Sequence, residues 1–180
     1  MSRHFITYSG KHFDIDCFSI DNIVIEDIAH ALAFICRGNG HYKRFYSVAQ
    51  HLLNCYWEAK ARSYPTNVVN ACLLHDASEA YLSDIISDIK SRIPQYSVIE
   101  NELMDIIYTK FGVSLSKSDA SLVKEIDEIV LWYEFVNLHS RPSWSAEPKI
   151  YSQMDFMTRP LHEIENAFLD ELHIAERMLV

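Results

Sequence analysis

The chain has 180 residues, a formal net charge of −9, and 49% hydrophobic and 12% aromatic residues. This composition excludes a disordered chain and disfavours a general binder of nucleic-acid polymers or anionic membranes. The length suits one folded unit with its own core, so a single domain covering residues 1–180 is expected.

The first 22 residues differ from the rest of the chain. Two short segments, Phe5–Tyr8 and His12–Phe18, flank Gly10, where the chain of a short β-hairpin could turn. Residues 1–22 are therefore expected to form a small N-terminal β element.

The remaining chain has the apolar period of helices. The chain has only 4 Gly and 5 Pro, the residues that most often interrupt helices and form turns, which favours long helices over many short strands. Ser116 or Ser118 would cap the fifth long helix. Helices are expected at residues 25–36, 47–62, 66–76, 95–111, 116–139 and 161–178, with a short amphipathic turn at 85–90 and loops at 37–44 and 140–158. The predicted fold class is an all-α bundle with a short N-terminal β-hairpin.

The four cysteines are widely spaced and no CxxC motif occurs, which indicates reduced thiols in a cytoplasmic protein. The N-terminal segment lacks the apolar stretch of a signal peptide. No apolar run approaches the ~20 residues of a membrane span. A cytoplasmic location without a membrane partner is therefore expected.

The segment 71–80 carries the most informative pattern. A fully apolar run leads directly into His75 and Asp76, and Glu79 follows three residues later. Burying an imidazole and two carboxylates is costly unless a cation or a hydrogen-bond network compensates them. His51 and Asp127 lie on two other predicted helices, and helices of a bundle can bring such side chains together. These residues form a candidate site for one divalent metal.

Each residue also has a simpler interpretation. A His-Asp pair occurs by chance, and Asp127 competes with neighbouring acids on a solvated helix face. Adjacent residues of a helix diverge by about 100°, so His75 and Asp76 can share an ion only beside the edge between them or at a helix end. Histidine and carboxylate ligands favour Mn, Fe, Co, Ni or Zn, while Mg remains open.

Several ordered segments resemble the HD-domain superfamily of metal-dependent phosphohydrolases, whose ligand pattern is H…HD…D. The similarity is greatest to small single-domain 5′-deoxynucleotidase-like and phage-type members. The matching residues are Asp27–His30, Arg37, Gly40–His41, Phe45–His51, Leu73–Tyr81, Asp84, Lys90 and Val123–Asp127. The resemblance implies a helical bundle on a five-helix core.

The resemblance also implies roles for individual residues. The metal ligands would be His51, His75, Asp76 and Asp127, and the catalytic residues would be Glu79 and Asp84. Glu79 would handle the proton of the attacking water or of the leaving group, and Asp84 would assist with water or sugar. Substrate would be bound by Arg37, His41 and Lys90, with the planar guanidinium of Arg37 holding phosphate.

Three features of the sequence limit the choice of substrate and metal. Gly38 follows Arg37 where related deoxynucleotidases have tryptophan, so a steric selection against ribonucleotides is in doubt. Positions 77–126 contain no histidine, whereas two-metal HD enzymes draw further histidine ligands from that interval, so a single metal is expected. Ala80 after Glu79 argues against the alarmone hydrolases, which carry an acid there.

The expected function is hydrolysis of a small phosphomonoester, such as a nucleoside or deoxynucleoside 5′-monophosphate, with water activated by the metal. The alternative is a module that binds metal and nucleotide without hydrolysis, as a sensor or partner surface. A third interpretation is that the His-Asp pair only ties helices together. The family includes homodimers, and residues 131–135 could form such an interface, although their aromatic side chains fit a core better.

Overall fold

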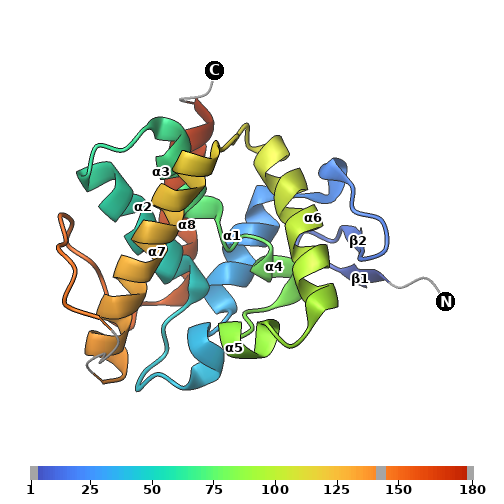
Figure 1. Cartoon of the computed structure of the whole chain (residues 1–180). Coiled ribbons are helices and arrows are strands. Elements are labelled where there is room, and N and C mark those ends of the chain that lie inside the picture. The colour runs from blue at the N-terminus through green and yellow to red at the C-terminus, as the bar shows by residue number, and fades with distance from the viewer. Residues whose placement is uncertain (1–3, 141–144, 178–180) are drawn as a thin grey trace.

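The structure is a computed structural model that describes residues 4–140 and 145–177 (Figure 1). It is mainly helical with one short antiparallel hairpin, which confirms the expected class. The elements are β1 His4–Ile6, β2 His12–Asp14, the 3-10 turn η1 Ile20–Asn22, α1 Ile25–Phe34, the 3-10 turn η2 Arg37–Gly40, α2 Val48–Ala61, α3 Thr66–Leu74, α4 Glu79–Leu82, α5 Ser87–Lys90, α6 Pro94–Lys110, α7 Lys117–Leu138 and α8 Leu161–Arg177.

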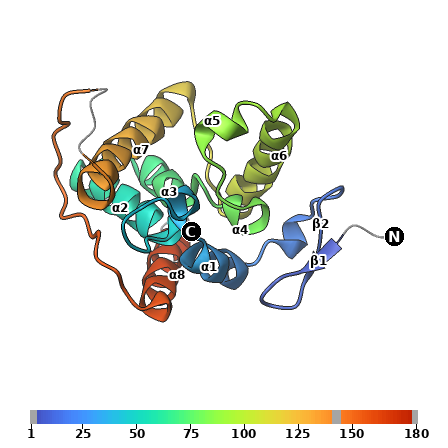
Figure 2. The same cartoon turned by 90° about the horizontal axis from the view of Figure 1, so that it is seen from below.

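The hairpin lies at the edge of the bundle, at the end away from α7 (Figure 2). Its register pairs Phe5 with Phe13, and Gly10 takes the left-handed conformation (φ 84°) that the turn requires. Phe13 is buried and stacks on Tyr81 at a ring-centroid distance of 4.2 Å. One aromatic side chain therefore anchors the hairpin to the end of α4.

Helix α2 is the centre of the bundle and contacts α1, α3, α7 and α8. It begins with a capping box, in which the Ser47 hydroxyl accepts from the Gln50 backbone and the Gln50 side chain accepts from the Ser47 backbone. Nearly every residue from Val48 to Ala59 is buried, as expected for a helix covered on all sides. Polar residues on this helix must therefore find partners inside the protein.

Capping chemistry sets the ends of α6 and α7. Gly112 follows α6 with φ 63°, and the N–H groups of Gly112 and Val113 bond back to the carbonyls of Thr109 and Tyr108 in a Schellman motif. Helix α7 begins with Ser116, which forms a capping box with Asp119. The cap is thus Ser116, and the alternative Ser118 is wrong.

Helix α1 ends earlier than the sequence pattern predicts. It stops at Phe34, and Ile35 is already extended (ψ 121°). Cys36 then forms an antiparallel bridge with Ser47, and Ile35 O accepts from the backbone of Val48. Pairing with the chain that enters α2, and not the glycines further on, ends the helix.

The segment before α8 contains neither helix nor strand within residues 145–160, as expected, while the part of the predicted loop at 141–144 lies outside the described residues. Pro160 directly precedes α8, and its carbonyl accepts the N–H groups of Glu163 and Ile164. Among the helices of the described ranges, none is long and apolar enough to cross a membrane.

Candidate metal centre

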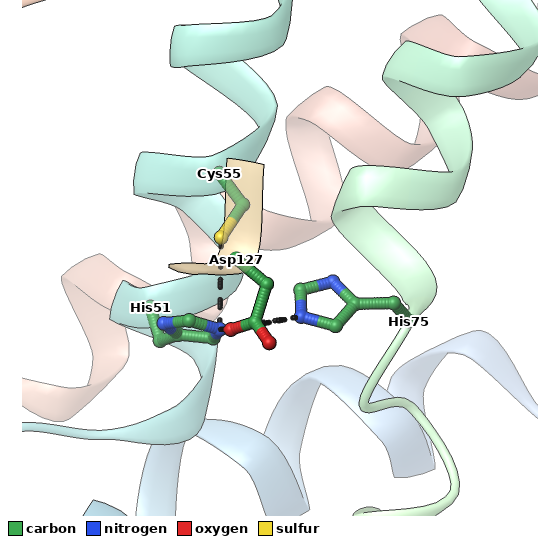
Figure 3. Close-up of side chains that lie close together, drawn as sticks. All are labelled: His51, Cys55, His75 and Asp127. Atoms are coloured by element: carbon green, nitrogen blue, oxygen red, sulfur yellow. Dashed lines mark hydrogen bonds and ion pairs between the residues drawn. The ribbon is translucent and has the colours of Figure 1, made fainter. Parts of the chain in front are cut away.

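Side chains from three helices meet beside α2 (Figure 3). Nε2 of His51 lies 3.3 Å from Nε2 of His75 and 3.2 Å from Oδ1 of Asp127 on α7. The same Oδ1 is 3.8 Å from Nε2 of His75. Cys55, one turn after His51 on α2, joins them, so that one donor atom from each of the four residues lies within 4.8 Å of all the others. Three residues that the sequence singled out as ligands are therefore brought to one point.

The end of α3 makes this convergence possible. The helix ends at Leu74, and His75 is its C-cap residue. Nδ1 of His75 lies 3.0 Å from the carbonyl oxygen of Cys72, which a continuing helix would offer to the N–H of Asp76. The chain then turns before α4, so His75 and Asp76 need not diverge as two residues of one helix would.

The two imidazoles present the same nitrogen to the centre. Nδ1 of His51 is 2.7 Å from Oε1 of Glu134, and Nδ1 of His75 faces the Cys72 carbonyl, so each Nδ1–H donates to an oxygen. In neutral rings both Nε2 lone pairs then point into the centre, where they face each other at 3.3 Å. Such tautomer control by an outer oxygen is what metal-binding histidines usually show.

The charges around His51 favour its protonated form when no other cation is bound. Burial and Arg37 lower the pKa of His51, but Cys55, Glu134 and Asp127 outweigh them and the pKa lies well above its usual value. Burial raises the pKa of Asp127, and the nearby imidazoles more than reverse this, leaving it well below the usual range. A metal ion would take the place of the proton on Nε2 of His51.

Asp76 lies at the border of the centre. Its Oδ2 is 3.7 Å from Nε2 of His75, 3.8 Å from Nε2 of His51 and 3.1 Å from the guanidinium of Arg37. The side chains of Asp76 and Asp127 are 22% and 35% exposed, whereas that of His51 is fully buried. The centre is therefore open to solvent on the side of the two aspartates.

Arg37 is held by three carboxylates of the centre. It bonds Glu134 and Asp76 at 3.1 Å each and lies 3.7 Å from Asp127. Arg37, predicted to bind substrate, lies beside the candidate ligands, and its guanidinium is already paired with protein groups. Asp84 supports the same turn, because its Oδ2 accepts the N–H of Gly38 at 2.7 Å. In the structure Asp84 thus fixes the backbone that carries Arg37.

Glu79 is buried at the start of α4, and its Oε2 has no hydrogen-bond partner. Burial, with the nearby charges of Asp76 and Asp84, raises the pKa of Glu79 well above its usual value, although Arg37 and Lys90 oppose the shift. The raised pKa makes Glu79 hold a proton more readily than an exposed glutamate does.

The two other predicted substrate-binding residues are less closely tied to the centre. The Lys90 ammonium is 2.6 Å from Glu100 and lies over the Tyr96 ring. His41 is exposed, and its backbone N–H bonds the Gly38 carbonyl. Within the part of the chain that the structure describes, neither side chain contacts a candidate metal ligand.

Cys55 and Glu134 were missed by the sequence reasoning. Cys55 follows His51 by four residues, and Glu134 follows Asp127 by seven, so each lies on the same helix face as a candidate ligand. These spacings are the signals that could have identified them. Burial raises the pKa of Cys55 to about 11, so the free thiol is neutral. Glu134 is completely buried, and its Oε2 accepts from Arg37 and Tyr42.

The residues present fit a divalent cation. Oδ1 of Asp127 is buried without a hydrogen-bond partner, beside the two opposed imidazole nitrogens. Carboxylates also outnumber cationic side chains around the centre. Arg37 is a cation that contacts three of these carboxylates. The carboxylates in and around the centre are Asp76, Glu79, Asp84, Asp127 and Glu134. An ion held by nitrogen, oxygen and sulfur donors would be a transition metal or zinc and not calcium.

Comparison with known proteins finds relatives of this chain in bacteria. It is 42% identical to uncharacterized protein YfdR of Escherichia coli (strain K12) over 107 residues, which are 59% of this chain and 57% of YfdR. It is 30% identical to uncharacterized protein RCAP_rcc00048 of Rhodobacter capsulatus over 186 residues, which cover 95% of this chain and 94% of that protein. The chain belongs to the family of RCAP_rcc00048. No family model matches the chain.

Proposed function

We propose that this chain is a metal-dependent phosphohydrolase of the HD-domain type that acts on a small phosphomonoester. The observation that carries the proposal is the meeting of His51, His75 and Asp127 from three helices, with Asp76 at 3.7 and 3.8 Å from the two imidazoles. The substrate class is a nucleoside or deoxynucleoside 5′-monophosphate, and the bundle would be the five-helix HD core. These finer assignments rest on the resemblance of the sequence segments described above.

The ion would be held by His51, His75, Asp76 and Asp127, and when bound it supplies a Lewis acid that lowers the pKa of water. Glu134 keeps His51 in the tautomer that presents Nε2. The aspartates line the solvent-exposed side, where a phosphate monoester can enter.

Glu79 suits the proton transfer of this reaction. Water supplies the new oxygen of inorganic phosphate, the phosphorus–oxygen ester bond breaks, and the leaving alcohol oxygen needs a proton. Burial raises the pKa of the Glu79 carboxyl group, and a raised pKa favours the protonated form that can donate this proton. Arg37 lies beside the same carboxylates and would share its donors with the incoming phosphate.

The test is phosphate release from a panel of nucleoside and deoxynucleoside 5′-monophosphates with Mn, Co, Mg or Zn added. Asp127→Asn is expected to lower turnover by at least about 100-fold, because losing a ligand should cost no less than losing an outer partner. Glu79→Gln is expected to lower it about 10²- to 10⁴-fold. Glu128→Gln, an exposed neighbour on α7, should behave as the wild type.

A metal-loaded wild type that releases no phosphate from any substrate would overturn the proposal. The second candidate, a module that binds metal and nucleotide without hydrolysis, is favoured by one observation: Arg37 is already paired with Glu134 and Asp76. Calorimetry with the same nucleotides separates the two functions, because such a module would bind nucleotide stably without releasing phosphate.

A further inference from the structure

The thiol of Cys55 is part of the metal centre. Its Sγ lies 3.6 Å from Nε2 of His51, and it is within 4.8 Å of the donor atoms of His75 and Asp127. The residue is completely buried on α2, pointing in Figure 3 toward the same point as the other three side chains. The centre thus offers a soft sulfur donor that the four expected ligands do not include.

Four of the six separations between the donor atoms are known, and they are close to those of a tetrahedral zinc site. With Zn–N of about 2.05 Å and Zn–S of about 2.3 Å, tetrahedral geometry places two nitrogens about 3.3 Å apart and a nitrogen and a sulfur about 3.6 Å apart. The structure has 3.3 Å between the Nε2 atoms of His51 and His75, and 3.6 Å between Nε2 of His51 and Sγ of Cys55. Oδ1 of Asp127 lies 3.2 and 3.8 Å from the two nitrogens, around the roughly 3.4 Å expected for oxygen.

Two observations independent of the cysteine also indicate a ligand at this point. Oδ1 of Asp127 is a buried atom without a hydrogen-bond partner. The opposed Nε2 atoms of His51 and His75 come from rings whose Nδ1 atoms already face oxygen acceptors. Asp76, in contrast, is held by Arg37 at 3.1 Å and lies outside the group of four that share the 4.8 Å limit.

We propose that the centre has two alternative four-donor sets, and that Cys55 decides which metal uses each. Zinc takes His51, Cys55, His75 and Asp127, a closed set. Harder ions such as manganese take His51, His75, Asp76 and Asp127, the hydrolytic set, and leave the thiol unbound. When zinc binds, the sulfur–hydrogen bond breaks, the proton passes to water, and the sulfur electron pair binds the ion. This inference shares the metal centre of the proposed function but not its hydrolysis.

Cobalt substitution tests the thiol directly. Co²⁺ is added to the purified protein as a spectroscopic probe of the zinc set, and the near-ultraviolet thiolate-to-cobalt charge-transfer band is recorded. The band is expected in the wild type and in Cys72→Ser, a matched control that alters an equally buried cysteine outside the group of four. It is expected to be absent in Cys55→Ser. Chelator competition should show zinc affinity at least about tenfold weaker in Cys55→Ser and manganese affinity unchanged.

A wild type without the band, or a Cys55→Ser variant that keeps it, overturns the proposal. If the variant does not fold, X-ray absorption of the zinc-loaded wild type decides, because a sulfur neighbour at about 2.3 Å is required. Phosphate release with manganese is scored separately. A thiolate signal without hydrolysis would retain the zinc set and reject the phosphohydrolase, whereas hydrolysis without the signal would do the reverse.

Discussion

Helix α2 carries two buried charged groups two turns apart, and their surroundings are opposite. Glu58 is the first: its oxygens accept from the Arg62 guanidinium, the backbone N–H groups of Tyr151 and Ser152 and the Ser152 hydroxyl, at 2.7 to 3.1 Å. The second is His51, whose Nε2 faces another Nε2 and a carboxylate oxygen.

Burial of charge is therefore not itself the sign of a functional site. In the Glu58 cluster, formed by Glu58, Arg62, Tyr151 and Ser152, donors and acceptors are matched, and nothing further is needed for stability. In the centre around His51, the Nε2 atoms of two imidazoles face each other, and oxygens of Asp127 and Glu79 have no hydrogen-bond partner. A mismatch of this kind is costly unless a cation enters.

The largest effect is expected from breaking the matched cluster. Glu58→Ala leaves Arg62 and two backbone N–H groups without their acceptor, and it should lower the free energy of unfolding by about 3 kcal/mol. Urea denaturation measures the loss. Glu125→Ala is the matched control, because it removes the exposed partner of the same arginine and should cost less than about 1 kcal/mol.

The loss in Glu58→Ala should also depend on pH. Burial raises the pKa of Glu58, but Ser152 and Arg62 outweigh this and hold it below its usual value. Stabilisation by a carboxylate of lowered pKa is complete above the pKa of the unfolded chain, about 4.3, and fades as the pH falls through the folded pKa. The difference in stability between wild type and variant must therefore shrink in acid. A difference independent of pH would show that the carboxylate charge is not what stabilises this cluster.

An intermediate effect is expected from Glu134→Gln, which keeps an oxygen for His51 but removes the charge beside Arg37. Outer partners of metal-binding histidines typically contribute 10- to 100-fold to affinity, so binding of Co²⁺ should weaken by that factor. Titration calorimetry measures it, with Glu128→Gln as the exposed control on the same helix. If the variant binds Co²⁺ as tightly as the wild type, Glu134 has only a structural role, like the residues of the Glu58 cluster.

Local sequence signals predicted most of the fold. Most predicted helix and hairpin bounds lie within a few residues of those observed. They were predicted from apolar periodicity, from Ser116 as one of two candidate caps, from Gly112 and from the turn at Gly10. The end of α1 was missed because it depends on pairing with residues 46–48, a contact between segments that periodicity does not contain.

The candidate site was predictable only in part. His51, His75 and Asp127 stood out because polar residues interrupted or bordered apolar faces, and the structure brings them together. The paired state of Arg37 was not predictable, since Glu134 and Asp76 reach it from different elements. The end of α3 at His75 was not predictable either. There the His75 side chain bonds the carbonyl of Cys72.

The smallest effect is expected at the turn that carries Arg37. Gly38 has φ 64°, and a Cβ there would meet the Tyr42 ring at an ordinary 3.6 Å, so Gly38→Ala costs backbone strain of about 1 kcal/mol and little else. Gly10→Ala, at φ 84° in the hairpin and with open space around the Cβ position, should cost a similar amount. Urea denaturation compares the two losses.

Metal affinity separates these two turns. Gly10 is remote from the centre, so its substitution must leave Co²⁺ binding unchanged. The N–H of Gly38 bonds Asp84, and Arg37 bonds Asp76. If Gly38→Ala also binds Co²⁺ as the wild type does, the turn is an independent scaffold like the Glu58 cluster. A selective loss in Gly38→Ala would instead make the position of Arg37 part of the metal centre, because the strain would then reach the ligands through Asp76.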